Sequence, residues 1–288
     1  MVGAAGAMVW DTKMKPASFN YARCDTADEA LELLAEQGDE ARVLAGGQSL
    51  MAMLNMRLVK PSILIDITEL DGLRYIKESS GMIEIGATTT QAELEAWPQL
   101  KRHLPLVAAA MPHIGHFQTR HRGTVCGSLC HADPSSELPL CLATLGGEVV
   151  LSSRRRKRVV NADEFHIGLL TTAKRADELM VTARYPMVRT GFGYAFREIS
   201  RRHGDFAIVA LAAMVGAGKI RLGVGGVADK PTVREWDNLD DSELPDALND
   251  FAWDLGGSDD IHATARYRRE MVRRLGRKVI EEARQCAS

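Results

Sequence analysis

The residues best suited to chemistry lie in two glycine-containing loops. The first spans 43–50 and reads Val-Leu-Ala-Gly-Gly-Gln-Ser-Leu, and the second spans 122–128 and reads Arg-Gly-Thr-Val-Cys-Gly-Ser. Glycines let backbone N–H groups come close to a pyrophosphate, and the start of a following helix adds a favourable dipole. Each loop therefore predicts a phosphate-cradling turn, although a Gly-Gly turn before a helix is also common as simple punctuation.

Neither loop carries a common nucleotide or catalytic motif. The first loop lacks the Gly-Lys-Ser/Thr of a Walker motif, and the chain has no G-x-G-x-x-G dinucleotide pattern. Ser49, Ser128 and Asp133 are not accompanied by a G-x-S-x-G elbow. The histidines near the second loop have no HExxH spacing, and Cys126 and Cys130 match no iron–sulfur signature. We therefore expect no catalytic residue and no metal ligand in this chain.

Length and composition fit a globular protein with two domains, or with one large domain and a smaller appendage. The chain has 288 residues, of which 45% are hydrophobic and 26% are charged, and its net charge is -2. This balance gives no field that would favour nucleic acid, and no stretch approaches the ~20 apolar residues of a membrane span. The five cysteines are scattered and odd in number, which favours a reducing cytoplasm. The basic run 154–158 is expected to be a solvated turn.

The periodicity predicts strands and helices that would position the loops. Thr26 begins and Gly38 ends a helix over 27–37, a strand over 42–45 enters the first loop, and a helical pattern over 50–56 leaves it. The block 115–137 is crowded with small and polar residues and is expected to be an irregular loop. The other predicted elements are strands over 63–67, 73–77, 82–87, 148–152, 158–160 and 179–185, helices over 104–111 and 138–145, a three-strand meander over 192–198, 206–215 and 219–227, and a last amphipathic helix over 261–285.

Together the two loops resemble the A-G-G-x-S and T-I-G-G motifs of the flavoprotein subunit or domain in the molybdenum hydroxylases, the xanthine dehydrogenase and carbon monoxide dehydrogenase family. The resemblance runs from about Lys15 to Ala283 and includes the Ile85–Thr90 segment, the Gly-Gly-Val-Ala turn within Leu222–Ala228 and the start of the last helix. It implies an α+β fold: a two-subdomain FAD-binding fold of the vanillyl-alcohol-oxidase/PCMH type, then a C-terminal antiparallel three-strand sheet plus helices.

The resemblance also implies a division of the chain. A FAD-binding domain would span 14–188, with subdomains of about 14–70 and 71–188, and a C-terminal flavoprotein domain would span 191–288. Residues 1–13 are expected to be a disordered extension, and either Met1 or Met14 is the natural start.

In that family the two loops wrap the FAD pyrophosphate. Glu137 stands where an acidic residue binds the sugar or ribityl region, the backbone near Met180 would meet the flavin, and Arg197 stands where a basic residue commonly contacts the cofactor. Cys126 replaces a family glycine, which would cost roughly 1 kcal/mol or more if that position required a positive φ. The expected FAD-binding residues are Val43, Leu44, Ala45, Gly46, Gly47, Gln48, Ser49, Leu50, Ala87, Thr88, Thr89, Ile114, Gly123, Thr124, Val125, Cys126, Gly127, Ser128, Glu137, Met180 and Arg197.

The function that the resemblance implies is electron transfer by the FAD-carrying medium subunit of a molybdenum hydroxylase. Its partners would be a small subunit with [2Fe–2S] clusters and a large molybdopterin subunit, arranged as a dimer of heterotrimers. Electrons would pass from molybdenum through the clusters to FAD and then to NAD, oxygen or a quinone. The substrate would be an aromatic N-heterocycle, a purine, an aldehyde or carbon monoxide. A stand-alone FAD oxidase of the vanillyl-alcohol type and a flavin-free scaffold subunit are the alternatives.

Overall fold

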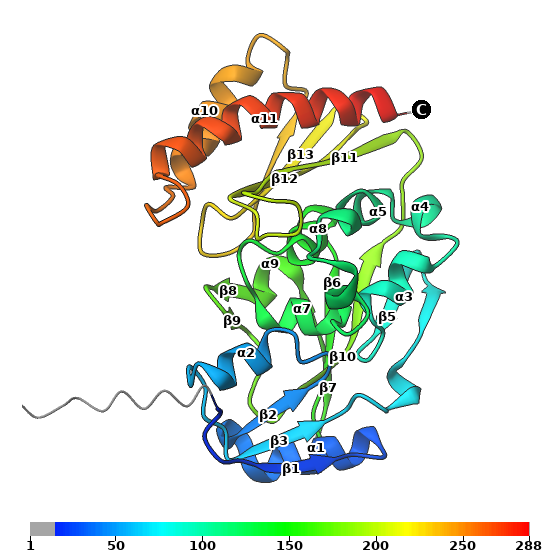
Figure 1. The fold of residues 1–288 in the computed structure, drawn as a ribbon. Coiled ribbons are helices and arrows are strands. Elements are labelled where there is room, and N and C mark those ends of the chain that lie inside the picture. Colours follow the sequence, from blue (N-terminus) through cyan, green and yellow to red (C-terminus); the bar gives the residue numbers. More distant parts are fainter. Residues whose placement is uncertain (1–14, 288) are drawn as a thin grey trace, which may run out of the picture.

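The protein is described by a computed structural model that covers residues 15–287. The expectation of a disordered extension over residues 1–13 lies outside the described residues. Three sheets of three or more strands follow one another from the first described residues to the last helix, α11 (Ala265–Cys286), as Figure 1 shows. This mixed α/β architecture confirms the predicted fold class.

The first sheet carries the first glycine loop. It is parallel, with strand order β1-β3-β2, and its elements are β1 (Asn20–Arg23), α1 (Ala27–Gln37), η1 (Gly38–Glu40), β2 (Ala41–Leu44), α2 (Leu50–Asn55) and β3 (Ile63–Asp66). The predicted boundaries of α1 are confirmed, because the Thr26 side chain accepts the Glu29 N–H and Gly38 turns the chain with φ +51°. The loop leaves β2 at the carboxyl end of the strand, the usual ligand-binding end of a parallel sheet.

The second sheet has the order β4-β5-β10-β6-β7 and is covered by short helices. The elements of this part of the chain are η2 (Asp71–Leu73), β4 (Ile76–Ser79), β5 (Met82–Gly86), α3 (Gln91–Ala96), α4 (Leu100–His103), α5 (Pro105–Ala110), η3 (Met111–His113), α6 (Phe117–Arg120), α7 (Val125–His131), α8 (Glu137–Leu145), β6 (Glu148–Ser152), β7 (Lys157–Asn161), α9 (Ala162–Phe165), β8 (His166–Gly168), β9 (Thr171–Thr172) and β10 (Leu179–Pro186). Strands β8 and β9 pair with each other in a separate two-stranded sheet.

The expectation of an irregular loop over 115–137 is wrong, because α6 and α7 lie within it. Thr124 begins α7 by accepting the Gly127 N–H at 3.0 Å. The small residues that made this stretch look irregular allow α7 to pack closely: Val125, Cys126 and Leu129 are buried.

The third sheet is antiparallel and has four strands, not the three expected. Its order is β11-β12-β13-β14, with β11 (Phe192–Ile199), β12 (Val209–Gly216), β13 (Lys219–Gly225) and β14 (Thr232–Asp237), followed by α10 (Leu244–Asp254) and α11. The missed strand is an edge strand, and its charged residues pair with its neighbour, as in the Glu235 contacts to Lys219 and Arg221. Half-exposed edge strands lack the apolar alternation that reveals inner strands.

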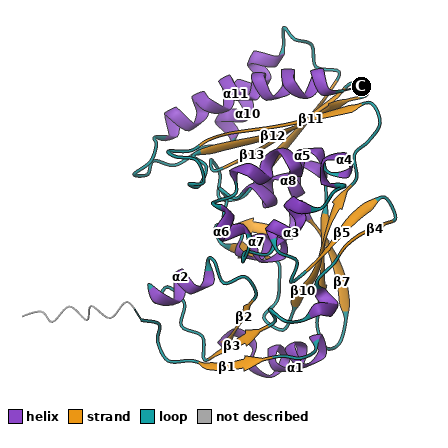
Figure 2. Ribbon diagram, turned by 45° about the vertical axis from the view of Figure 1, so that its right-hand side comes forward, coloured by secondary structure: helices purple, strands orange, loops and turns teal. Residues whose placement is uncertain are grey.

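The two faces of the third sheet bury different residues. Along β11, Tyr194 and Phe196 pack against the core of the preceding part of the chain, whereas Ala195 packs with α10 and α11. This is the period of two expected of a strand. Helices α5 and α8 lie between the second and third sheets, as Figures 1 and 2 show, so one face of β11 points toward the glycine loops and the other points away.

The basic run 154–158 is more than a solvated turn, because Arg158 lies in β7 and holds a buried acid. Its Nε and Nη2 donate to Glu178 at 2.7 and 2.8 Å, and the Glu178 side chain is only 1% exposed. Burial alone would raise the pKa of Glu178, but the hydrogen bonds from Arg158 and the Arg175 N–H lower it overall.

We expect the Arg158→Met variant to lose about 2 kcal/mol of unfolding free energy at neutral pH, because it leaves the Glu178 carboxylate buried with fewer donors. The loss should shrink as pH falls below the ordinary glutamate pKa of 4.5, since the stability given by a lowered folded pKa is complete above that value and disappears as the carboxylate is protonated. Chemical denaturation measures both effects. Arg155→Met, in the exposed part of the same run, is the control, and equal losses in both variants would contradict the assignment.

Candidate functional site

The two glycine loops, distant in sequence, are in backbone contact. A methyl group placed on Gly46 would overlap the carbonyl oxygen of Arg122 and come within 2.7 Å of the Gly123 Cα. No flexible side chain can move aside there, because both neighbours are backbone. The loops therefore form one continuous backbone surface, and the position requires glycine.

The second loop is fixed to the segment that follows β5. The Gln91 N–H donates to the Gly123 carbonyl at 2.8 Å, and the Val125 N–H donates to the Thr89 carbonyl at 3.1 Å. Thr90 and Thr124 form an isolated antiparallel bridge between these hydrogen bonds. The loop is thus held on both sides before α7 begins, which preorganises its backbone.

The first loop is a tight turn in which the second residue of the Gly46–Gly47 pair must be glycine. Gly47 has φ +70°, a conformation that other residues rarely adopt, and the Gln48 side chain donates to the Gly46 carbonyl at 3.2 Å. Ser49 precedes α2 but makes no side-chain capping bond to that helix. The residues flanking the turn are Val43 and Leu44 in β2, Ala45 before the glycines, and Leu50 at the start of α2.

Several other expected residues are structural in their contacts. The Thr88 hydroxyl donates to the Leu70 carbonyl at 3.1 Å, and the Thr89 hydroxyl donates to the Tyr75 carbonyl at 3.0 Å. Ala87, Ile114 and Met180 are buried apolar side chains. The side chains of these five residues are thus packed or hydrogen-bonded within the protein.

Cys126 causes no strain in the second loop. It is the second residue of α7 and does not have a positive φ. The conformational cost of a Cβ at a positive φ therefore does not apply to this position. Burial raises the pKa of the Cys126 thiol well above its usual range and that of Cys130 to about 11. Both thiols are therefore neutral at physiological pH, which fits small packing residues rather than nucleophiles.

A buried acidic cluster lies between the second sheet and the third. Glu137, the first residue of α8, is 7% exposed. Burial raises its pKa to about 7, with Glu198 and Asp133 adding to the shift and His113 opposing it. His113 Nδ1 lies 3.3 Å from Glu198 Oε1, and this hydrogen bond raises the pKa of His113 despite partial burial.

Arg197 does not join this cluster. Its guanidinium makes a bidentate ion pair with Glu282 of α11, with Nε to Oε2 at 2.8 Å, and thus lies on the face of β11 that points away from the loops. Glu198, the neighbour of Arg197 on the opposite face of β11, joins the cluster instead and was not among the expected residues. The alternation within a strand is the signal that could have placed Glu198 beside Phe196.

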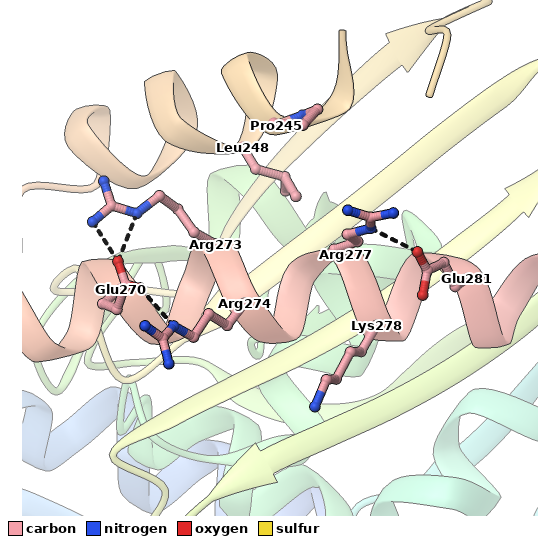
Figure 3. Close-up of a pocket in the computed structure, with 8 residues that line it drawn as sticks. All are labelled: Pro245, Leu248, Glu270, Arg273, Arg274, Arg277, Lys278 and Glu281. Carbon is pink, nitrogen blue, oxygen red and sulfur yellow. Dashed lines mark hydrogen bonds and ion pairs between the residues drawn. The ribbon is translucent and has the colours of Figure 1, made fainter. Parts of the chain in front are cut away.

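Two hollows flank the third sheet. One, of about 580 Å³, lies where Asp133–Ser135 meets the Gly204–Ile208 segment, close to the acidic cluster. The other lies between α10 and α11, and Figure 3 shows its charges pairing along the helix: Arg273 and Arg274 contact Glu270, while Arg277 contacts Glu281. The second hollow lies against α11, beyond the sheet from the glycine loops, and is not part of the candidate site.

Comparison with known proteins identifies the family to which the chain belongs. Residues 17–188 match the family described as the FAD binding domain in molybdopterin dehydrogenase, and residues 194–283 match the CO dehydrogenase flavoprotein C-terminal domain. The chain belongs to this flavoprotein family. As in the sequence-based expectation, it is thus similar to the medium subunits of molybdenum hydroxylases.

Individual members of the flavoprotein family align over nearly the whole chain. The 6-hydroxypseudooxynicotine dehydrogenase complex subunit alpha of Paenarthrobacter nicotinovorans is 35% identical, with 94% of this chain and 96% of that protein covered. The nicotine 6-hydroxylase medium subunit of the same organism is also 35% identical, with 94% and 99% covered. Reconstituted CO dehydrogenase from Oligotropha carboxidovorans superposes with a TM-score of 0.89 at 30% identity, with 94% and 99% covered.

The residues present fit the cofactor of the flavoprotein family. A diphosphate needs a close approach of backbone N–H groups, and the joined loops supply a surface on which Gly46 and Gly123 carry no side chain. The buried Glu137 offers a carboxyl group that is partly protonated near pH 7.

None of the described helices combines the length and the apolar character that a membrane crossing needs. No group of three or more His, Cys, Asp or Glu within residues 15–287 is placed to hold a metal ion.

Proposed function

We propose that the two joined loops hold the diphosphate of one FAD and that the chain relays electrons as the medium subunit of a molybdenum hydroxylase. The backbone contact between Gly46 and the Arg122–Gly123 peptide is the observation that carries the proposal. Family membership supplies the identity of the ligand. When bound, FAD accepts electrons in pairs and can release them singly or in pairs.

The chain's own residues would bind and orient the cofactor. We assign the diphosphate to the backbone of 43–50 and 123–128, the sugar or ribityl region to Glu137, and a contact with the flavin to the backbone near Met180. Thr88, Thr89 and Ile114 would position these groups, since their side chains are buried or already bonded. Arg197 is left out because Glu282 engages it on the far face of the sheet. We also propose that 14–188 forms the FAD-binding domain and 191–288 the C-terminal domain.

The partners follow from the relatives. Because related chains are named as subunits of hydroxylases and dehydrogenases, we propose a small [2Fe–2S] subunit and a large molybdopterin subunit, assembled as a cytoplasmic dimer of heterotrimers. An aromatic N-heterocycle is the proposed substrate class, since two of the relatives are named for nicotine and a nicotine derivative. Electrons would travel from the partner clusters to the FAD site of this chain and on to an external acceptor.

Co-purification from the native host tests this assignment. We expect two further chains, together with molybdenum, iron and FAD in constant ratio, and hydroxylation of an N-heterocycle by the complex. A yellow chain that purifies alone and oxidises an alcohol would instead support a stand-alone oxidase. A colourless chain that cannot be reconstituted with FAD would support the scaffold and would overturn the proposal.

A further inference from the structure

Glu198 leaves a buried carboxylate oxygen without a partner. Its side chain is 3% exposed, and its Oε1 lies 3.3 Å from His113 Nδ1. Its Oε2 is buried and has no hydrogen-bond partner within residues 15–287. A buried unsatisfied group of this kind costs about 1–3 kcal/mol, and more when it is charged. Such an atom in a native protein requires an explanation, and a donor supplied by a bound ligand, water or ion is one of them.

Strand β11 places Glu198 on the face that points toward the candidate FAD site. Phe196, on the same face of β11, lies with its ring centroid 5.3 Å from that of His113. Glu137 of α8 is close enough to Glu198 for the two carboxyl groups to interact electrostatically. Glu198 therefore reaches from the third sheet toward the residues that we assign to FAD, while Arg197 points to α11.

The charges around Glu198 leave its second oxygen ready to accept. The hydrogen bond to Glu198 raises the pKa of His113, and His113 Nδ1 fixes Oε1. Glu137 is partly protonated near neutral pH, so the two acids do not both carry a full charge. Glu198 Oε2 still lacks a hydrogen-bond donor. Both halves of a flavin dinucleotide carry hydroxyl or ring N–H groups that could donate to it.

We propose that Glu198 is a cofactor-positioning residue whose Oε2 accepts a hydrogen bond from a hydroxyl or ring N–H group of FAD, while His113 fixes Oε1. The inference rests on the proposed function and extends it, because it adds a contact from the C-terminal sheet to a cofactor otherwise held by the glycine loops. It assigns to β11 the role of closing the site over FAD.

Titration of the full-length apo chain with FAD tests the inference. Glu198→Gln is expected to weaken FAD binding by about 10- to 100-fold, the effect of removing a hydrogen bond to a charged group. Glu198→Ala is the second variant, in case the glutamine amide replaces the contact. The matched control is Glu282→Gln, the same change on α11, which packs against the other face of β11; it should alter affinity less than about twofold because an exposed pair contributes little.

The reduction potential of bound FAD identifies the donor. A higher potential in Glu198→Gln places the contact at the flavin ring, because a negative charge near the ring disfavours its reduced form. Weaker binding with an unchanged potential places it at a hydroxyl. If both Glu198 variants bind FAD as tightly as the wild type, the inference is overturned while the proposed function stands. If the wild type itself does not bind FAD, the proposed function fails and the inference fails with it.

Discussion

Gly46→Ala is expected to reduce FAD affinity at least 100-fold. The added methyl group overlaps the Arg122 carbonyl and crowds Gly123, so one loop must move away from the other. If the movement breaks two backbone hydrogen bonds to the charged diphosphate, each worth about 1.5–3 kcal/mol, the loss exceeds about 100-fold. Flavin fluorescence titration of the apo chain measures the dissociation constant.

Gly72→Ala provides the matched control for this change. A methyl group on Gly72 meets no atom within 4 Å, and its φ is not positive, so the same substitution there should leave FAD affinity unchanged. Thermal unfolding of both variants separates a local movement of the loop from general destabilisation. Wild-type affinity in Gly46→Ala would show that the contact between the loops is irrelevant to the cofactor.

Glu137→Gln is expected to stabilise the FAD-free chain by about 3 kcal/mol at pH 8. Burial raises the pKa of Glu137 from 4.5 to about 7, so the folded state binds this proton more tightly than the unfolded state. A raised carboxyl pKa means that stability falls as pH rises from about 4.5 to about 7, by about 1.4 kcal/mol for each pH unit. The glutamine variant lacks this loss, and its stability should depend less on pH.

Urea denaturation between pH 5 and pH 8 measures this difference. The raised pKa of His113 gives a loss of the same sign above its ordinary value of 6.5, and this loss remains in both proteins. Glu78→Gln, an exposed change on β4, is the control and should not alter the slope. Parallel pH profiles for wild type and Glu137→Gln would mean that Glu137 titrates normally in the fold.

Local signals in the sequence predicted most of the elements near the loops. Thr26 and Gly38 define α1 through backbone hydrogen bonds within one turn, so its ends could be read directly. The glycine pair at 46–47 likewise reported a tight turn. The meeting of this turn with Arg122 depends on how β2 and α7 pack, and no local pattern carries that information. Only the family resemblance linked the two loops before the structure did.

The missed strand and the direction of the Arg197 side chain have a common physical origin. Residues 232–237 alternate little in polarity because β14 is half exposed at a sheet edge, so the strand was missed. The family resemblance placed Arg197 at the cofactor, whereas the pleat of β11 turns its side chain toward Glu282 and turns Glu198 toward His113. Residue type alone does not reveal which face of a strand a side chain occupies.

Comparing FAD with riboflavin as ligands tests the central claim most directly. If the joined loops bind the diphosphate, the apo chain should bind one equivalent of FAD. It should bind riboflavin, which has no phosphate, at least about 100-fold more weakly, which corresponds to a difference in binding free energy of about 2.7 kcal/mol. Equal affinity for the two ligands, or no binding of FAD, would contradict the account.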